Sequence, residues 1–166
     1  MSALHGILLV DKEQGWTSHD VVAKARGITH QRKIGHTGTL DPMATGLLVL
    51  CLGDATRLAE YLTGHDKRYE GTICLGAATD TDDAEGTVIS QAPVPVLTAD
   101  TLQQLERQFT GPLRQRPPAY SAVKVAGQRA YAAARAGNPL QLAERTVTIH
   151  RLYLEQLGPH QLRAMV

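Results

Sequence analysis

The segment that most constrains this chain is a glycine-rich stretch, residues 35–46, that runs directly into six apolar residues at positions 47–52. The apolar run has the length of a buried strand, and three glycines make the preceding stretch a loop rather than a helix. Within that stretch Asp41 precedes Pro42, a pair that favours extended backbone and a turn. The pattern predicts a loop that ends on a core strand and holds one carboxylate at its rim.

Taken alone, this loop allows two interpretations. Asp-Pro pairs form turns in many proteins without any chemistry, and His36 could be a structural or surface histidine, one of seven in the chain. Alternatively, the glycines let the backbone approach a ligand closely, and Asp41 points into a cleft. A Walker-type phosphate loop is disfavoured, because no Lys-Ser or Lys-Thr pair follows the last glycine.

The composition is that of an ordinary globular protein of one domain, with 43% hydrophobic and 20% charged residues. The longest apolar run is six residues, too short to cross a bilayer, and residues 7–10 are expected to form a first strand rather than a signal peptide. Cys51 and Cys74 lie in apolar segments and are expected to be buried thiols. Because nothing suggests a disulfide framework or a metal site, the sequence predicts a cytoplasmic protein without a membrane partner.

Local periodicity predicts an alternation of strands and helices. Strands are expected at residues 6–11, 47–52, 68–75, 87–90, 146–154 and 161–166, with an extended segment at 119–125 and a loop at 111–118. Helices are expected after the capping residues Ser18, Asp54 and Thr98 and at residues 129–136. The inward-facing residues of the first two helices would be Val21, Val22, Ala25, Ile28, Leu58, Tyr61 and Leu62. Strands in hairpin order with interspersed helices indicate an α+β domain around a mixed, mainly antiparallel sheet.

Charge is distributed unevenly, although the net charge is only +1. Residues 103–135 contain six basic residues and one acidic residue, whereas residues 80–100 contain five acidic residues and no basic one. A basic face would suit contact with the phosphates of a nucleic acid. A solvated helix face would explain the basic run equally well.

The loop is similar to the signature of the TruB family of bacterial tRNA pseudouridine-55 synthases. The resemblance runs through residues 35–42 and 44–46 and continues at residues 52–56. Three other segments resemble the family in the expected order: residues 9–15, residues 66–69 leading to 75–86, and residues 116–124. Because four motifs occur in the expected order, the catalytic interpretation of Asp41 is favoured over that of a simple turn residue. The resemblance extends from about Gly6 onward and implies the pseudouridine synthase fold, a long mixed sheet with flanking helices and the active-site cleft across it.

The implied activity is the isomerisation of uridine 55, in the T loop of tRNA, to pseudouridine. The glycosidic bond breaks, the uracil rotates, and it rejoins the sugar through carbon, so neither a redox cofactor nor a metal is needed. The family's catalytic aspartate corresponds to Asp41, and covalent glycosidases provide a parallel for a carboxylate nucleophile. An aspartate is ionised at neutral pH, so Asp41 needs orientation more than activation. The sequence leaves open whether it attacks the sugar or the pyrimidine ring.

The resemblance also assigns roles to residues around the aspartate. His36 would fill the space left by a flipped uridine. Tyr69 would stack on the flipped base and help to remove the proton from its carbon; the alternative is a core aromatic residue of a strand. Lys12 would support the active-site loop; the alternative is a surface lysine at the end of a strand. The other residues expected at the substrate are Gly38, Thr39, Arg116 and Lys124.

Two other functions fit parts of the sequence. The segment Asp80-Thr81-Asp82-Asp83 resembles the magnesium-binding Asp-x-Asp of a phosphohydrolase, but residues 76–79 make a poor preceding strand, and an acidic hairpin turn is the better interpretation. A noncatalytic RNA-binding module of the same fold is the second alternative. Asp41 and Tyr69 argue against it, because phosphate contact requires neither residue.

Members of the family continue beyond the strand at residues 161–166. They enter a Gly-Thr-Tyr-Ile-Arg segment, whose arginine pairs with the catalytic aspartate, and then a C-terminal RNA-binding domain. Neither occurs in these 166 residues. The resemblance therefore implies an incomplete catalytic domain over residues 1–166, a monomer that binds the T arm of tRNA. We expect the isolated chain to be inactive or nearly so.

Overall fold

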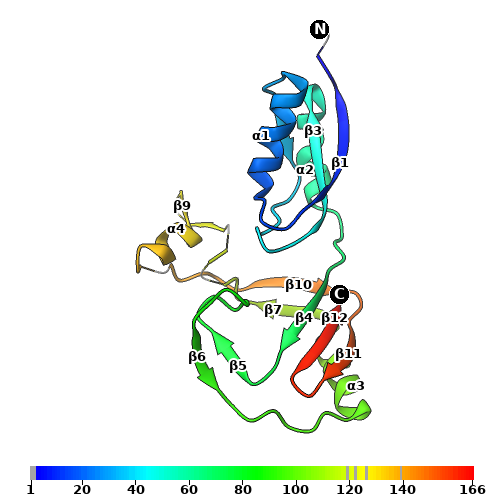
Figure 1. Cartoon of the computed structure of the whole chain (residues 1–166), viewed down its shortest axis with the longest axis vertical. Helices are drawn as coiled ribbons and strands as arrows, with labels where there is room; N and C mark the ends of the chain where they lie inside the picture. The colour runs from blue at the N-terminus through cyan, green and yellow to red at the C-terminus, as the bar shows by residue number, and fades with distance from the viewer. Residues whose placement is uncertain (1–2, 119, 122, 126, 139) are drawn as a thin grey trace. The chain divides into compact units, whose positions relative to one another are not determined.

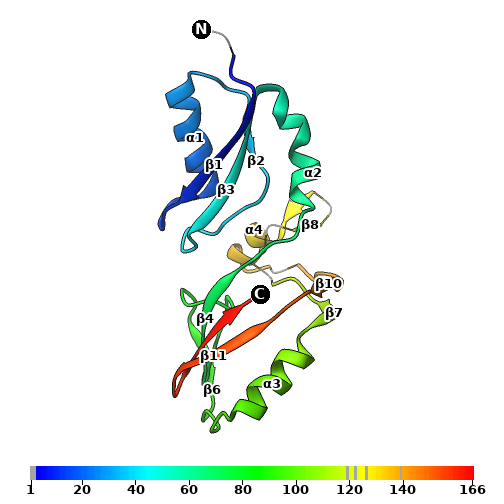
Figure 2. The same ribbon diagram turned by 90° about the vertical axis from the view of Figure 1, so that its right-hand side faces the viewer.

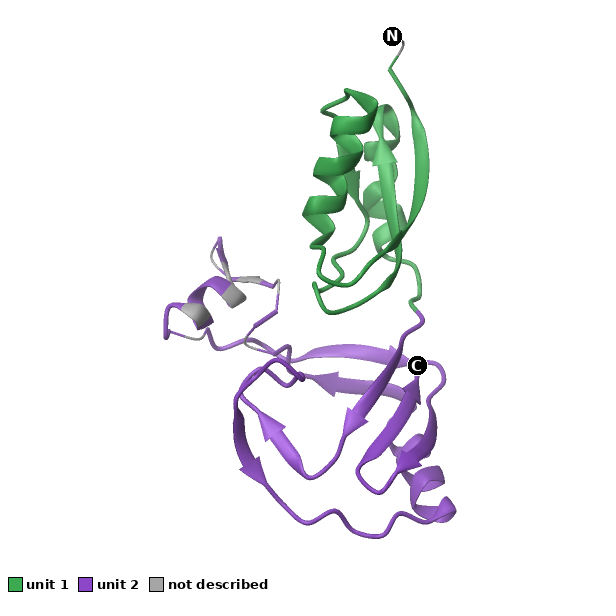
Figure 3. Ribbon diagram, viewed as in Figure 1, with its two compact units in different colours: residues 1–67 green, residues 68–166 purple. Residues whose placement is uncertain are grey.

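The structure is a computed structural model that describes residues 3–118, 120–121, 123–125, 127–138 and 140–166. The chain divides into two compact units, Met1–Lys67 and Arg68–Val166, called here the first and the second unit (Figure 3). Both combine helices with antiparallel strands, which confirms the α+β prediction. Among the described residues, no helix combines the length and apolar character needed to cross a membrane.

The first unit is a three-stranded antiparallel sheet, of order β1-β3-β2, with α1 packed on one face (Figures 1 and 2). Its elements are β1 (Gly6–Lys12), α1 (Ser18–Thr29), β2 (Ile34–His36), β3 (Gly46–Leu52), the 3-10 helix η1 (Gly53–Leu58) and α2 (Ala59–Thr63). In the β1–β3 pair, Lys12 lies opposite Gly46. The loop that follows β1 and the loop that precedes β3 therefore meet at the same end of the sheet.

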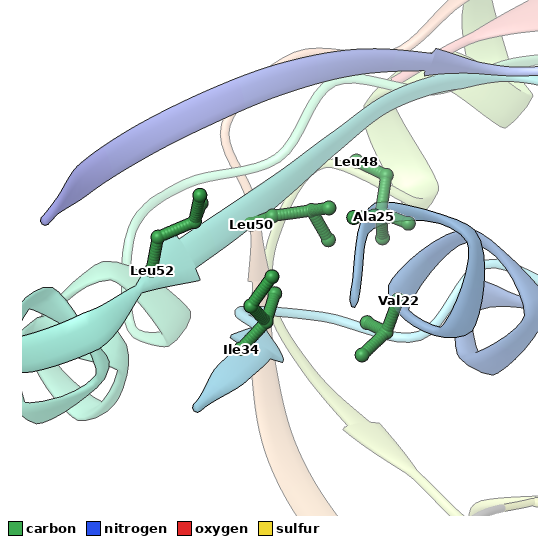
Figure 4. Close-up of a cluster of buried hydrophobic side chains, with 6 residues drawn as sticks. All are labelled: Val22, Ala25, Ile34, Leu48, Leu50 and Leu52. Atoms are coloured by element: carbon green, nitrogen blue, oxygen red, sulfur yellow. The ribbon is translucent and has the colours of Figure 1, made fainter. Parts of the chain in front are cut away.

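The core of the first unit lies between α1 and the central strand β3. Its buried side chains are Val22 and Ala25 of α1, Ile34 of β2, and Leu48, Leu50 and Leu52 of β3 (Figure 4). The three leucines alternate along the strand and so share one face of the sheet. The strand predicted at residues 47–52 is confirmed as β3, and this strand carries the end of the glycine-rich loop. Its burial is incomplete, because Leu47 is 64% exposed.

Ile28 does not face this core as expected. It is 68% exposed and lines an apolar groove together with Leu8 and Val10 of β1. The strand order makes β1 an edge strand of its sheet, so the side of α1 that faces β1 is covered less than the side that faces β3. Helical spacing identifies an apolar stripe, but it does not say how far the sheet beneath it extends.

The residue that caps α1 is Thr17, not Ser18. The Thr17 hydroxyl accepts a hydrogen bond from the Asp20 N–H at 3.0 Å, and the Asp20 carboxylate accepts one from the Thr17 N–H at 2.9 Å. This reciprocal pair is a capping box. The Thr17 hydroxyl also lies 2.6 Å from the Asp20 carboxylate, and this side-chain hydrogen bond, with the backbone one, lowers the pKa of the Asp20 carboxyl. Ser18 is instead the first helical residue and is 2% exposed.

Asp54 does not cap a helix as expected. Its carboxylate accepts a hydrogen bond from the Lys33 ammonium at 2.8 Å, which holds the pKa of Asp54 below its ordinary value. No side-chain cap is present at η1 or α2. Leu58 and Tyr61, expected to face inward, are 48% and 69% exposed. The Asp54 carboxylate, which the local sequence predicts as a helix cap, is thus bound by the charge of Lys33, 21 residues away in the sequence.

Over its described residues, the second unit consists of small antiparallel sheets and two helices (Figure 1). Its elements are β4 (Glu70–Cys74), β5 (Ala77–Thr79), β6 (Val88–Gln91), α3 (Ala99–Gln108), β7 (Gly111–Gln115), β8 (Lys124–Val125), β9 (Gln128–Arg129), α4 (Ala130–Arg135), β10 (Arg145–Ile149), β11 (Tyr153–Gly158) and β12 (Gln161–Met165). The strands pair as β11-β12-β4, β5-β6, β10-β7 and β8-β9. The helix expected at residues 129–136 is confirmed as α4.

Thr98 caps α3 as predicted, since its hydroxyl accepts a hydrogen bond from the Thr101 N–H at 3.2 Å. The helix is joined to the sheet where the Leu154 N–H of β11 donates to the Glu106 carboxylate at 2.8 Å. Cys51 is buried, and burial raises the pKa of its thiol. Cys74, also expected to be buried, is exposed on β4.

Two strand predictions in the second unit were wrong. The expected loop at residues 111–118 begins with strand β7, which pairs with β10. The single strand expected at residues 146–154 is two strands, because β10 pairs with β7 whereas β11 pairs with β12. Of the extended segment expected at 119–125, residues 119 and 122 lie outside the described residues, and β8 forms its end. The choice of partner strand decides both boundaries.

Candidate active site

Asp41 stands at the first position of a tight turn. The Ala44 N–H donates a hydrogen bond to the Asp41 carbonyl at 3.0 Å, and Pro42 occupies the second position, where its fixed φ suits a turn. The turn expected from the Asp-Pro pair is therefore present. The side chain of Asp41 is exposed, and no hydrogen bond or ion pair joins its carboxylate to another described residue. The backbone of Asp41 therefore forms the turn, while its exposed carboxylate is accessible to a ligand.

The loop after β1 holds the loop that carries Asp41. The Gly15 N–H donates a hydrogen bond to the Pro42 carbonyl at 2.8 Å. Ser18 contacts the residue on the other side, because its hydroxyl accepts a hydrogen bond from the Leu40 N–H at 2.8 Å and donates one to the Leu40 carbonyl at 3.2 Å. Both neighbours of Asp41 are thus bonded to residues 15–18.

Lys12 is buried, with 1% of its surface exposed, at the end of β1. Its ammonium donates hydrogen bonds to the carbonyls of Trp16, at 2.8 Å, and Glu13, at 3.1 Å. A buried ammonium needs such acceptors, because desolvation without them is costly. The alternative of a surface lysine is excluded, and the contacts are those of a side chain that supports the loop after β1.

His36 is the last residue of β2, where the glycine-rich loop begins. The ring is half-buried, and its Nδ1 atom is buried without a hydrogen-bond partner among the described residues. The next residue, Thr37, is 8% exposed and donates its N–H to the Val49 carbonyl of β3 at 3.1 Å. The backbone beside His36 is therefore fixed, while no internal hydrogen bond holds the imidazole Nδ1 atom.

The three glycines of the loop differ in their backbone requirements. Gly46 adopts a φ of +117°, which side-chain-bearing residues rarely adopt. Gly35 and Gly38 have no such φ, and a Cβ atom added to either would meet nothing within 4 Å. Thr39, beside Gly38, is exposed. Packing within the chain therefore gives no reason for a glycine at position 38.

Tyr69 belongs to the second unit and directly precedes β4. Its backbone pairs with Val166, with N–H to carbonyl distances of 2.7 and 2.9 Å in the two directions. Its side chain is 53% exposed, so the alternative of a core aromatic residue is not what this structure shows. The phenol ring is anchored through its backbone and presents its surface outward.

Two basic residues of the second unit, Arg114 and Arg116, meet one acidic side chain. Arg116 lies 3.4 Å from Glu144, and Arg114 lies 3.5 Å from the same carboxylate. Both guanidinium groups are largely exposed, so this pair of ion pairs leaves a net positive charge at the surface. Lys124 lies on β8, and its side chain is outside the described residues.

The acidic segment expected to form a hairpin turn does so, between β5 and β6. The Asp83 carboxylate accepts hydrogen bonds from the Thr81 hydroxyl, at 2.6 Å, and the Glu85 N–H, at 2.9 Å. The Thr81 bond lowers the pKa of the Asp83 carboxyl. Asp80 accepts a hydrogen bond from the Thr87 N–H at 2.8 Å. These carboxylates are used to build the turn.

Comparison with known proteins places these residues in a family. Residues 26–166 match the TruB family pseudouridylate synthase (N terminal domain), which is most of the chain. This chain belongs to the TruB family. It is 48% identical to tRNA pseudouridine synthase B of Arthrobacter sp. (strain FB24), over 98% of this chain and 53% of that protein. It is 52% identical to the Thermobifida fusca (strain YX) protein of the same name, over 87% of this chain and 50% of that protein.

The chain spans about half the length of these curated TruB-family relatives. Among solved structures, a chain in the crystal structure of a Cbf5-Nop10-Gar1 complex matches with a TM-score of 0.70 and 27% identity, covering 98% of this chain and 39% of that chain. A chain of an H/ACA RNP bound to a substrate RNA containing 2'-deoxyuridine has the same fold, with a TM-score of 0.65, 23% identity, and coverage of 98% and 37%. The pseudouridine synthase fold implied by the sequence is confirmed.

The structure brings together only part of the expected TruB-family site. Lys12, His36 and Asp41 belong to the first unit, as do Gly38 and Thr39. The residues of the second unit are Tyr69, Arg116 and Lys124. A meeting of Tyr69 with Asp41 therefore stays a prediction, and so do the roles of all these residues toward a substrate.

Sequence reasoning missed the two residues that bond directly to the neighbours of Asp41, namely Gly15 and Ser18. The sequence predicts Ser18 as a helix cap, a role that requires no tertiary contact. The only local signal was Gly15, the last residue of a segment that resembles the family. Such a signal does not identify a partner 22 residues away.

Proposed function

We propose that this chain catalyses the isomerisation of uridine to pseudouridine at position 55 in the T loop of tRNA. One observation carries the proposal: an exposed carboxylate, Asp41, stands on a loop of the family-matching region whose backbone is fixed on both sides. Relatives about half identical to the chain are named tRNA pseudouridine synthase B, which supports the substrate class.

The reaction balances without a co-reactant. The bond between N1 of uracil and C1′ of the ribose breaks, and a bond forms between C5 and C1′. The proton on C5 leaves, and N1 gains a proton. We propose that Asp41 is the nucleophile that carries the detached species through this exchange, by attack on either the sugar or the ring. Its exposure and its lack of a described partner support this role.

Base flipping would bring the uridine to Asp41. Extruding a base from folded RNA costs about a few kcal/mol, which contacts with the protein must offset. His36 would fill the vacated space; the imidazole has no Nδ1 hydrogen bond to break before it moves. The open space beside Gly38 would admit the RNA backbone. Tyr69, exposed and aromatic, would stack on the flipped base.

The T arm is the proposed binding partner, and the second unit would contribute phosphate contacts. Arg116 and Arg114 share one carboxylate, so two positive charges face one negative charge at this surface. Exposed guanidinium groups bind phosphate oxygens in two-pronged geometry, which gives salt-dependent affinity. Thr39, exposed on the Asp41 loop, would meet the same RNA.

The test is the release of tritium from tRNA labelled at C5 of uracil, with protein in excess over RNA so that a slow reaction is still measured. We expect slow release by the parent chain, consistent with an isolated chain that is nearly inactive, and this release should not depend on magnesium. We expect none above background by Asp41→Asn, which keeps size but loses nucleophilicity. RNA binding by the two proteins should be equal.

Each alternative predicts a different outcome of this assay. Equal tritium release by the parent and Asp41→Asn would refute the catalytic role of Asp41. Tight RNA binding without any release by the parent would favour the noncatalytic RNA-binding module. Phosphate release that requires magnesium would favour the phosphohydrolase.

A further inference from the structure

The side chain of Ser18 makes both of its hydrogen bonds to one residue, Leu40. Its hydroxyl accepts the Leu40 N–H at 2.8 Å and donates to the Leu40 carbonyl at 3.2 Å. A hydroxyl has one hydrogen to donate, so the donating capacity of Ser18 is used entirely on Leu40. The side chain is 2% exposed, which keeps competing water away from both bonds. Both polar backbone groups of the residue before Asp41 are thus fixed by a single buried atom.

The residue after Asp41 is held from the same segment. The Gly15 N–H donates to the Pro42 carbonyl at 2.8 Å, and the proline ring fixes φ at that position. Asp41 therefore lies between two anchored neighbours, while its own carbonyl accepts the Ala44 N–H of the turn. What remains free is rotation within the side chain, which has only two torsions.

The buried Lys12 ammonium fixes the anchoring segment, because it bonds the carbonyls of Glu13 and Trp16. The start of α1 has a cap of its own, the capping box of Thr17 and Asp20. Because Thr17 supplies the cap, the Ser18 hydroxyl is not needed to begin the helix. Its contacts with Leu40 are a separate function of the side chain.

We propose that Ser18 is a positioning residue for Asp41, acting through the backbone of Leu40; this inference rests on the proposed function. A carboxylate nucleophile that is already ionised gains from orientation, and a shift of about 1 Å at a reacting group can lower a rate about a hundredfold. Ser18 transmits the position of α1 and of the core beneath it to the exposed carboxylate. The proposal assigns no contact between Ser18 and RNA.

Ser18→Ala is the test variant, and Thr17→Ala is its matched control. Thr17→Ala removes the helix cap next door but leaves the hydroxyl that bonds Leu40. We expect Ser18→Ala to increase hydrogen exchange of the Leu40 amide about five- to tenfold, which corresponds to the loss of about one ordinary hydrogen bond. It should also broaden the carboxyl carbon signal of Asp41 in NMR spectra. Thr17→Ala should leave both signals as in the parent.

The kinetic readout is the single-turnover rate on a T-arm stem-loop. We expect Ser18→Ala to lower the rate at saturating RNA about ten- to a hundredfold with RNA affinity within about twofold of the parent. Thr17→Ala should react at the parent rate. Ser18→Thr, which keeps the hydroxyl, should restore the rate. Ser18→Cys fills the same space with a weakly bonding thiol, so it should stay slow, and it replaces Ser18→Ala if that variant does not fold.

The outcomes separate the two proposals. A parent chain that reacts no faster than Asp41→Asn overturns the proposed function, and the NMR comparison of Ser18→Ala with Thr17→Ala still decides whether Ser18 positions Asp41. Unchanged Leu40 exchange and Asp41 signal in Ser18→Ala overturn the positioning role. A parent-like rate in Ser18→Ala, beside an inactive Asp41→Asn, overturns it as well.

Discussion

Leu50→Ala should unfold the first unit selectively, because Leu50 lies at the centre of its core. The side chain is 0% exposed and is surrounded by the other members of the core cluster, Val22, Ala25, Leu48 and Leu52 among them (Figure 4). Truncating a buried leucine removes its transfer free energy and leaves a cavity, which together lower the free energy of unfolding by about 3 kcal/mol. Such a loss is a large share of the stability of a small domain.

The same strand supplies the control. Leu47 is three residues earlier on β3 and is 64% exposed, so Leu47→Ala should change the free energy of unfolding by less than about 0.5 kcal/mol. Local strand propensity changes alike in both variants. Only burial distinguishes them.

Urea denaturation followed by tryptophan fluorescence measures this difference. Trp16 is the only tryptophan of the chain and lines the same groove as Leu50, so its signal reports on the first unit. With a urea dependence of about 1 kcal/mol per molar, Leu50→Ala should lower the midpoint by about 3 M relative to Leu47→Ala. Midpoints that agree within about 0.5 M would show that the cluster does not hold the unit together, and the reasoning from burial would fail.

Three further predictions concern the second unit and the surface. Tyr69→Phe should slow pseudouridine formation about ten- to a hundredfold with little change in RNA affinity, whereas Tyr69→Leu should also weaken RNA binding, because it loses the stacking surface. Single-turnover rates and filter binding measure the two effects. If both variants behave like the parent, Tyr69 has no role in the reaction. Arg116→Glu should reduce the slope of log affinity against log salt by about one, while Glu144→Gln should not reduce it, and an unchanged slope in Arg116→Glu would place the RNA elsewhere. Asp54→Asn should be less stable than the parent at neutral pH, because the lowered pKa of Asp54 means that its carboxylate stabilises the fold above the unfolded value of about 3.9. That advantage is lost as the pH falls through the folded pKa, so the urea midpoints of the two proteins should converge once the pH is below it. A gap that persists there would exclude the Lys33–Asp54 pair as its cause.

The sequence by itself determined the features whose physics is local. The turn at Asp41 follows from an Asp-Pro pair, the cap of α3 from a threonine before an amphipathic stretch, and the turn at residues 80–86 from alternating Asp and Thr side chains. The buried strand β3 follows from its uninterrupted apolar run. In each case the deciding partner lies within a few residues, so the pattern contains the whole interaction. The resemblance to the TruB family added the proposed catalytic role of Asp41, which turn chemistry alone did not favour.

Tertiary structure decided the features whose partners lie far along the chain. Asp54 was expected to cap a helix, but the charge of Lys33 binds its carboxylate. Residues 111–115 were expected to be a loop, but β10 supplies the hydrogen bonds that make them a strand. Cys74 sits in an apolar segment, yet nothing covers its face of β4 among the described residues. Burial and strand pairing depend on neighbours that a one-dimensional pattern does not name.

The candidate site shows the same division. The sequence predicted both Asp41 as a candidate site residue and the turn at this position, since a following proline restricts the backbone conformation of the aspartate. The burial of Lys12 and the bonds of Ser18 to Leu40 exist only because β1 and β3 pair in one register and bring two loops to the same end of the sheet. The orientation of a side chain in a site depends on tertiary contacts. The residues that make these contacts have no sequence signature that identifies them.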